Sequence, residues 1–334
     1  MIGFLARRVA LIVPTLVGVT ILTFLLIQWM PGDPAEILAG EHASPELIAQ
    51  LRTQLALDRP LAEQYVHYAG DLLRGDWGRS AKTHEPILRE IGRYFPATFE
   101  LTVSALFVAC AIGLPAGILA ARRPGGVVDG LSTSIASIGV SMPVFWLGLL
   151  SMYVFAVVFP VLPVSGRGSV VFTVPHRTGL LVLDSLLAGD LAAALLSAKH
   201  LLLPALVLGT VPMAVIARMT RSSLVDALSR DYVRTARAKG LRESAVLLRH
   251  AFRNGILPTL TIIGLQFGAL LGGAIITETI FAWPGVGRWI LLGVESRDVR
   301  VIQAGVLLMA LAFALVNLLT DMLYGWLDPR IKLR

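Results

Sequence analysis

Few residues of this chain have the types and spacing that covalent chemistry requires. None of the six histidines stands at metal-ligand spacing with another histidine or with the single cysteine. The dipeptide Gly-Lys never occurs, so the phosphate-binding pattern G-x-x-x-x-G-K-[ST] is absent. The nucleophile pattern G-x-S-x-G is absent as well. The sequence therefore predicts no catalytic residue, no metal site and no cofactor bound by this chain itself.

The residues with a clear chemical pattern are arginines in a hydrophilic segment, residues 218–258, which lies between two apolar runs. Over residues 222–238 apolar side chains recur at helical spacing opposite arginines, which predicts one amphipathic helix. Gly240 follows this pattern and is typical of a helix C-terminus. The pattern therefore predicts non-covalent binding, through a basic helical surface that contacts a partner in the aqueous phase.

A second amphipathic helix is predicted over residues 242–253. Its apolar stripe recurs at helical intervals and consists of Leu241, Ala245, Leu248 and Phe252. We call the helix–glycine–helix unit at residues 234–253 the elbow. A short surface helix of this kind can lie in a groove of a partner protein, or it can rest on anionic lipid as an interfacial helix.

The rest of the chain is too apolar for a soluble domain. Its 334 residues are 55% hydrophobic and 15% charged, with a mean hydropathy of +0.73, whereas soluble domains are about 25% charged. The apolar runs are continuous and not alternating, which predicts membrane-spanning helices and not barrel strands. We predict an all-α integral membrane protein with six spans, at residues 9–30, 98–121, 131–159, 200–219, 255–278 and 301–325.

A further apolar run, residues 180–200, is expected to stay outside the bilayer as a short surface helix. It carries Asp184, Asp190 and Lys199, and each charge costs about 2.5–3.5 kcal/mol near a span centre. The first apolar run is expected to be a retained span and not a signal peptide, because it is long and lacks a small-residue cleavage site.

These spans divide the chain into three parts. Residues 1–30 hold the N-terminus and the first span, residues 31–97 form an extracytoplasmic helical insertion, and residues 98–334 form the core with a long loop at 220–254. The insertion can be a lid on the span ends or a docking surface for an external partner. Of the 29 basic residues, 16 fall on the side that holds both termini and this loop, which predicts that this side is cytoplasmic. The net charge of +7 reflects this bias and does not indicate nucleic-acid binding.

Polar groups in or near the spans are candidates for a transport pathway, and each can instead be a hydrogen bond between packed helices. They are Ser141, Gln266, Thr277, Glu278 and Asn317. Gly264, Gly268 and Gly272 stand at four-residue spacing, which predicts close helix packing within the chain or against another subunit. Pro143 predicts a kink in the third span, which can line a pathway or serve packing alone.

Charged residues are nearly absent from the middle of the spans, where ion-coupled transporters usually bury acids. The charged candidates Glu278, Asp321 and Arg218 all stand near predicted span ends. A transporter with neither a fuel site nor an ion relay is expected to take its energy from another polypeptide. A stand-alone, ion-coupled secondary transporter is the alternative from a different class.

The elbow and its flanks resemble a known family. The sequence YVRTARAKGL, followed by VLLRHAFRNGILP, is similar to the cytoplasmic signature of permease subunits in bacterial ATP-binding-cassette importers. In the general signature Glu-Ala-Ala precedes a glycine at a fixed spacing. Here Arg234, Thr235 and Ala236 hold those places and Gly240 is the glycine, so only Ala236 and Gly240 match the general form. Arg-Thr-Ala, with a longer spacing to the following Leu-Pro, resembles the dipeptide/oligopeptide branch.

Further motifs along nearly the whole chain resemble the same branch. They are RRVALIVPTLVGVTILTFLLIQWMPGDPA, LDRPLAEQYVHYAGDLLRGDWGRS, FPATFELT, SMPVFWLG, LPVSGRGS and ETIFAWPGVGRW. The resemblance implies the type I importer permease fold in the bacterial cytoplasmic membrane. It implies a homologous second permease subunit, two cytoplasmic ATPase subunits that bind ATP and Mg, and an extracytoplasmic peptide-binding protein.

The resemblance also implies that the elbow seats in an ATPase groove and couples ATP hydrolysis to transport. The implied coupling residues are Arg234, Thr235, Ala236, Gly240, Leu241, Ala245, Leu248 and Phe252. Di- or oligopeptides are the expected cargo. Nickel chelates, glutathione or another small solute stay open as cargo, because the binding protein largely selects what is carried.

Overall fold

The computed structural model describes residues 2–28, 35, 44–54, 57–168, 174–175 and 177–327. Its regular elements in these ranges are helices. In chain order they are α1 (Ile2–Gln28), α3 (Pro45–Gln54), α4 (Leu61–Leu73), α5 (Ile87–Arg122), α6 (Val127–Ser141), α7 (Val144–Met152), the π-helix η1 (Tyr153–Val158), α8 (Leu181–Leu187), α9 (Leu191–Ser229), α10 (Asp231–Ala238), α11 (Glu243–Ala245), the π-helix η2 (Val246–Ala251), α12 (Phe252–Gly255), α13 (Leu257–Ile280), α14 (Val286–Glu295) and α15 (Val299–Leu327).

Four of these helices, α5, α9, α13 and α15, are long and apolar enough to cross a membrane. A fifth candidate is α6 together with the α7–η1 segment, a pair bent by 101°. A shorter apolar helix, Ala10–Leu25, lies within α1. The prediction of an all-α membrane protein is confirmed at this level, and the count of six spans stays a prediction.

The third predicted span, residues 131–159, is broken and not merely kinked. α6 ends at Ser141, and Met142 and Pro143 take extended conformations with ψ of 131° and 132°. Proline lacks an N–H group and disfavours the helical conformation in the residue before it. The local cause of the break is therefore Pro143, and α7 leaves it in a new direction.

The helix that contains the fourth predicted span extends beyond that span at both ends. α9 runs unbroken past the expected limits of 200–219, and Asp190 caps it by accepting a 2.9 Å hydrogen bond from the Ala193 N–H. The prediction of one amphipathic helix over 222–238 is wrong, because the chain turns extended at Arg230 (ψ 152°). The apolar pattern continues across the break because α9 and α10 bury their apolar faces in one core.

Glycines bring α5 and α9 into backbone contact. A Cβ at Gly117 would lie 2.6 Å from the carbonyl oxygen of Ala217, and a Cβ at Gly209 would lie 2.7 Å from that of Ala105. Gly113 meets α9 in the same way. Small residues allow such approach between helices in lipid, so α5 and α9 form a tightly joined pair.

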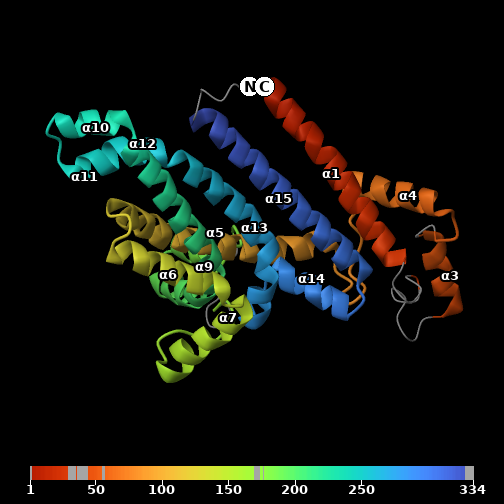
Figure 1. The fold of residues 1–334 in the computed structure, drawn as a ribbon. Coiled ribbons are helices and arrows are strands. Elements are labelled where there is room, and N and C mark those ends of the chain that lie inside the picture. Colours follow the sequence, from red (N-terminus) through yellow and green to blue (C-terminus); the bar gives the residue numbers. More distant parts are fainter. Residues whose placement is uncertain are drawn as a thin grey trace.

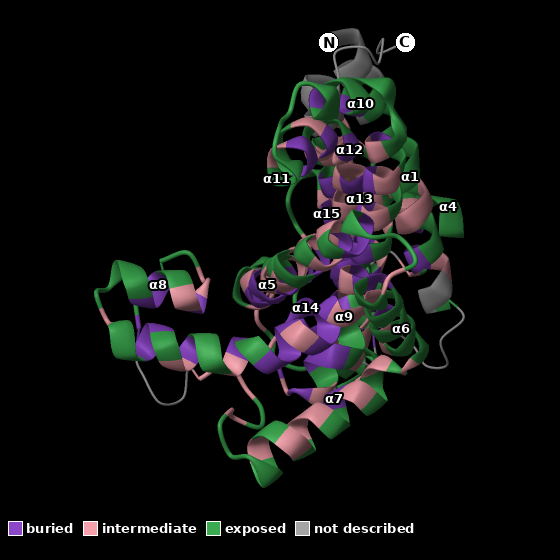
Figure 2. Cartoon of the chain, turned by 60° about the vertical axis from the view of Figure 1, so that its left-hand side comes forward, coloured by how far each residue is buried: buried purple, intermediate pink, exposed green. Residues whose placement is uncertain are grey.

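Figure 1 shows how the helices are arranged. α1, α13 and α15 run side by side, and an ion pair of 2.9 Å joins Arg8 on α1 to Asp321 on α15. α10, α11 and α12 lie at one end of the molecule and α7 at the opposite end. Buried residues are frequent along α9, whereas α7 consists almost entirely of exposed or half-buried residues (Figure 2).

Candidate functional site

The elbow turns at Gly240, between α10 and α11. Gly240 has a φ of +75°, and its N–H donates a 2.9 Å hydrogen bond to the carbonyl of Arg237. No described atom lies within 4 Å of where a Cβ at Gly240 would stand. The need for glycine is therefore the left-handed backbone and not crowding. The prediction that Gly240 ends the first helix is confirmed.

The second limb of the elbow exposes part of the predicted stripe and buries other apolar residues. α11, η2 and α12 follow one another from residue 243 to 255, with a π-helix over residues 246–251. A π-helix takes more residues per turn than an α-helix and so rotates the faces that follow. The structure buries Val246, Leu247 and Ala251 and leaves Leu241 and Leu248 exposed, by 42% and 56%. Ala245 and Phe252 are half-buried.

A small apolar core fixes the elbow to the ends of α5 and α9. Its buried members are Ala121, Leu224, Ala227, Val233, Ala236, Val246 and Ala251. Ala236 is only 6% exposed, so it attaches the elbow to α9 and does not present itself to a partner. Its neighbours Arg234 and Thr235 are exposed. Of the implied coupling residues, the surface ones are therefore Arg234, Thr235, Gly240, Leu241 and Leu248.

An ion pair bridges the two limbs of the elbow. Arg237 donates hydrogen bonds of 3.1 Å and 2.6 Å to the two carboxylate oxygens of Glu243. These hydrogen bonds hold the pKa of the Glu243 carboxyl below its usual value. The angle between the limbs is thus set by a left-handed glycine, a bidentate ion pair and a shared core.

A second polar site lies farther along α5, about 36 Å from Ala121 at a helical rise of 1.5 Å per residue. We call it the polar junction. It consists of Ala97, Thr98, Glu100, Arg167, Glu278 and Trp283. The indole N–H of Trp283 donates a 2.8 Å hydrogen bond to the Ala97 carbonyl. The Thr98 hydroxyl donates one of 2.6 Å to Glu278 and accepts one of 2.7 Å from the Val286 N–H.

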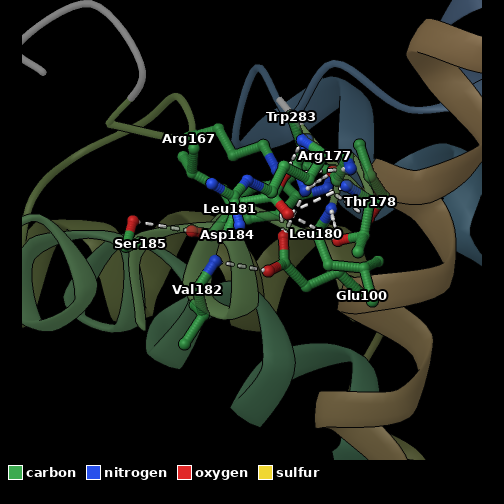
Figure 3. A network of polar contacts seen from close by, with 12 residues as sticks. Glu100, Arg167, Arg177, Thr178, Leu180, Leu181, Val182, Asp184, Ser185 and Trp283 are labelled. Carbon is green, nitrogen blue, oxygen red and sulfur yellow. Dashed lines mark hydrogen bonds and ion pairs between the residues drawn. The ribbon is translucent and has the colours of Figure 1, made fainter. Parts of the chain in front are cut away.

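A buried ion pair forms the other half of the polar junction (Figure 3). Arg167 donates from Nε to Glu100 at 3.0 Å and also from Nη2 to the same carboxylate oxygen. Nη2 donates a further 2.7 Å hydrogen bond to the Gly179 carbonyl, and the other Glu100 oxygen accepts from the Val182 N–H at 2.9 Å. The guanidinium lies 5.6 Å from the Trp283 ring centre, a cation–π distance. All charge in this pair is therefore compensated.

Asp184 orders the loop beside this ion pair (Figure 3). Its carboxylate accepts hydrogen bonds from the N–H groups of Arg177, Thr178 and Gly179 and from the Thr178 hydroxyl. Burial by itself raises the pKa of the Asp184 carboxyl, but these four hydrogen bonds outweigh burial and leave the pKa below its usual value. Residues 177–184 are thereby folded onto α5 next to Glu100.

The polar junction gathers motifs that are distant in the sequence. Thr98 and Glu100 belong to FPATFELT, Arg167 to LPVSGRGS, and Glu278 to ETIFAWPGVGRW. Gly148 of SMPVFWLG packs close by, where a Cβ would lie 3.4 Å from Ile280. Sequence reasoning missed this site as a unit. The signal that could have found it is an acid inside a predicted span, Glu100, which requires a partner for its charge.

The five predicted pathway residues differ in their surroundings. Glu278 is fully buried, and it accepts from Thr98 and from the Arg288 N–H at 2.9 Å. Thr277 is buried with no hydrogen-bond partner among the described residues. Ser141 is exposed and donates to the Ser137 carbonyl at 2.8 Å. Gln266 and Asn317 are half-buried.

Two apolar cavities adjoin α5, and Glu100 of the polar junction lines one of them. One of about 430 Å³ lies between α5, α8 and α9, and one of about 400 Å³ lies between α5, α6 and α9. None of the five predicted pathway residues lines either cavity. Glu278 in particular serves here as a buried tie between α13 and α5.

The predicted packing glycines on α13 divide into two kinds. A Cβ at Gly264 would lie 2.2 Å from Thr320, and a Cβ at Gly268 would lie 3.0 Å from Phe313, both on α15. Gly272 is exposed and has no described atom within 4 Å of its Cβ position. Close packing within the chain thus involves Gly264 and Gly268.

Two family models together match most of the chain. The model for the binding-protein-dependent transport system inner membrane component matches residues 113–333. The model for the N-terminal part of the binding-protein-dependent transport system membrane component matches residues 1–102. The chain belongs to this family. The resemblance seen in the elbow and in the other motifs is thereby confirmed.

Named relatives agree with the family over the full length. A dipeptide transport system permease protein of Alkalihalophilus pseudofirmus is 47% identical over 332 residues, covering 99% of this chain and 100% of the relative. A di/tripeptide transport system permease protein of Pseudomonas aeruginosa is 46% identical over 333 residues, 99% of both chains. A glutathione transport system permease protein of Escherichia coli is 41% identical over 332 residues, 99% of both chains. This member of the family is accordingly a multi-pass inner-membrane transport component.

Proposed function

We propose that this chain is the permease subunit of an ATP-binding-cassette importer that moves di- and oligopeptides across the bacterial cytoplasmic membrane. The observation that carries the proposal is the full-length identity of 47% and 46% to permeases named for dipeptide and di/tripeptide transport. The chain forms half of a pathway that a homologous second permease completes. Two cytoplasmic ATPase subunits bind ATP and Mg, and an extracytoplasmic peptide-binding protein delivers the cargo.

The proposed topology has six spans with both termini in the cytoplasm. α1 begins and α15 ends toward the same end of the molecule as α10–α12 (Figure 1). This arrangement supports placing the termini and the 220–254 loop on one side, as the distribution of basic residues favours. The bent pair of α6 and α7–η1 is the third span, and the insertion at residues 31–97 is extracytoplasmic.

The elbow is the proposed site at which conformational change in the ATPase subunits is transmitted to the permease. Its exposed residues offer a surface to an ATPase subunit, while the buried ones, Val233, Ala236 and Val246 among them, join it to α5 and α9. Closure of the ATPase pair on ATP displaces the elbow, and the shared core carries α5 and α9 with it. Two arrangements of these helices, one open to each side, satisfy the requirement for a two-state element biased by a partner.

Glutathione is the second candidate cargo, because a glutathione permease is 41% identical over the full length. The identity to the dipeptide permeases is higher, so peptides are the first choice. Nickel chelates have no support among these relatives. An ion-coupled mechanism has little support, since Glu100 and Glu278, the buried acids that fall within predicted spans, are both held in hydrogen bonds.

The test is reconstitution of the chain in proteoliposomes with its partner permease, ATPases and binding protein. We expect uptake of a labelled dipeptide that requires ATP in the compartment of the ATPases and is not driven by a proton or sodium gradient. Unlabelled tripeptide should compete, and glutathione and nickel–histidine should compete poorly. Uptake by vesicles that lack ATP and the ATPases would overturn the proposal.

A further inference from the structure

We propose that the partner groove that receives the elbow is acidic, with carboxylates placed around an apolar floor. This inference rests on the proposed function, in which an ATPase subunit binds the elbow. It adds the chemistry of that subunit's surface.

The elbow region carries more cations than it can neutralise. Three arginines are paired: Arg230 with Asp226 on α9 at 2.9 Å, Arg234 with Asp231 at 3.4 Å, and Arg237 with Glu243 at 2.6 Å. Four more cations have no ion pair or side-chain hydrogen bond with any described residue. They are Lys239, Arg242, Arg249 and Arg253, and all four are exposed.

Two of these cations follow exposed leucines directly in the sequence. Leu241 precedes Arg242, and Leu248 precedes Arg249. The leucines are 42% and 56% exposed, although apolar neighbours such as Val246 are fully buried in the core of the elbow. The exposed surface of the elbow therefore includes two leucine side chains and four cations that have no ion-pair partner among the described residues.

This composition fits a protein groove better than a lipid surface. An interfacial membrane helix presents a broad apolar face of large residues, but the apolar faces of both limbs are already used in the core with α9. A protein interface has an apolar centre and a polar rim. A cation that is desolvated at such an interface is costly unless a carboxylate meets it. The partner surface must therefore supply carboxylates opposite Arg242 and Arg249.

The experiment measures the affinity of the purified permease heterodimer in detergent for its ATPase subunits across a range of salt concentrations. The test variant is the double substitution Arg242→Gln with Arg249→Gln. We expect at least a tenfold loss of affinity at low salt and a weaker dependence on salt, because two of the four cations without an ion-pair partner are removed. The matched control is Arg74→Gln, directly after α4, an arginine whose side chain is 81% exposed, and it should leave the affinity unchanged.

A third variant, Leu248→Ser, separates failure of this inference from failure of the proposed function. If Leu248→Ser weakens ATPase binding while the double glutamine variant has wild-type affinity and salt dependence, the acidic groove is overturned and the docking role of the elbow stands. If neither variant affects ATPase binding, both proposals fail. If the double variant binds ATPase normally but loses binding to phosphatidylglycerol vesicles, the cations recognise lipid and the acidic groove is again overturned.

Discussion

The hydroxyl of Thr98 on α5 donates a 2.6 Å hydrogen bond to Glu278 on α13, and both side chains are fully buried. The same hydroxyl accepts the N–H of Val286 at the start of α14. A Cβ at Gly285 would lie 2.1 Å from the Glu278 carboxylate, so only glycine fits at position 285 beside this carboxylate. One hydroxyl and one carboxylate thus join three helices.

Replacing Thr98 by valine tests this joint. Thr98→Val keeps the shape of the side chain but leaves the Glu278 oxygen and the Val286 N–H without this partner. Each buried group left unpaired costs about 1–3 kcal/mol, so we expect a clear fall in the thermal unfolding temperature of the detergent-purified protein. Thr98→Ser keeps the hydroxyl and is the control. An unfolding temperature for Thr98→Val equal to that of the wild type would contradict the assignment.

The buried pair of Glu100 and Arg167 should behave as a unit. Removing one partner of a buried ion pair costs about 3–5 kcal/mol, because the other charge is left uncompensated. We therefore expect Glu100→Gln and Arg167→Met each to destabilise the protein strongly. The double variant should be less destabilised than the sum of the two, and a double-mutant cycle on chemical unfolding measures the difference. Strict additivity would show that the two side chains act independently.

Substitutions at two glycines of α5 distinguish the effect of close helix packing on stability from the effect of helix propensity. Gly117→Ala places a Cβ 2.6 Å from a carbonyl oxygen of α9, whereas Gly92→Ala on α5 meets no described atom within 4 Å. We expect Gly92→Ala to be neutral or to stabilise by about 0.5–1 kcal/mol. Gly117→Ala should destabilise by about 1–3 kcal/mol, the usual cost of overpacking. Thermal unfolding of both variants decides, and equal effects would argue against backbone contact between α5 and α9.

Adjacent residues of the elbow should respond in different ways. Ala236→Leu overfills the core that attaches the elbow, so we expect about 1–3 kcal/mol of destabilisation and ATP hydrolysis that no longer drives uptake. Thr235→Leu changes only an exposed position, so stability should be preserved while ATPase binding falls. The measurements are unfolding temperature and the ratio of ATP hydrolysed to peptide imported. Equal loss of stability in both variants would contradict the burial of Ala236.

Asp184 predicts a pH dependence with a defined sign. Hydrogen bonds hold its folded pKa below the unfolded value, which is about 3.9 for aspartate. The stability that it contributes is therefore fully present above about pH 4 and is lost as the pH falls through the lower folded pKa. The free energies of unfolding of the wild type and of Asp184→Asn should differ by a constant amount from pH 7 to pH 5. This difference should shrink as the pH falls further. If this difference disappeared already near neutral pH, a group other than Asp184 would be responsible for the pH dependence.

The sequence predicts helices well where a single local property decides them. Long uncharged runs predict α5, α9, α13 and α15 because burying charge in lipid is costly. Gly240 predicts the end of α10 because a left-handed residue is a requirement of the backbone itself. The effect of Pro143 is local too, but the 101° turn after it depends on what α7 packs against, such as Ile280 beside Gly148.

The two polar sites are harder to predict because their contacts are not local. Glu100 and Arg167 are 67 residues apart, and nothing near either residue in the sequence specifies the pairing. In the elbow, a short π-helix decides which apolar residues face inward, and a stripe counted at α-helical spacing misses this rotation. The stripe therefore identified an apolar surface of the second limb, of which Leu241 and Leu248 are exposed and Ala245 and Phe252 are half-buried, but it did not predict the buried residues Val246, Leu247 and Ala251.

The backbone contacts between α5 and α9 have a mechanical consequence. At Gly113, Gly117 and Gly209 the two helices meet without intervening side chains. Sliding or rotation of one helix against the other would cause steric clashes there, so we expect α5 and α9 to move as one rigid body. The elbow packs against one end of this rigid body, and Thr98 and Glu100 lie toward its other end. In the proposed function, displacement of the elbow therefore also moves the polar junction. By thermodynamic reciprocity, a ligand that restrains the polar junction then also opposes closure of the proposed ATPase pair.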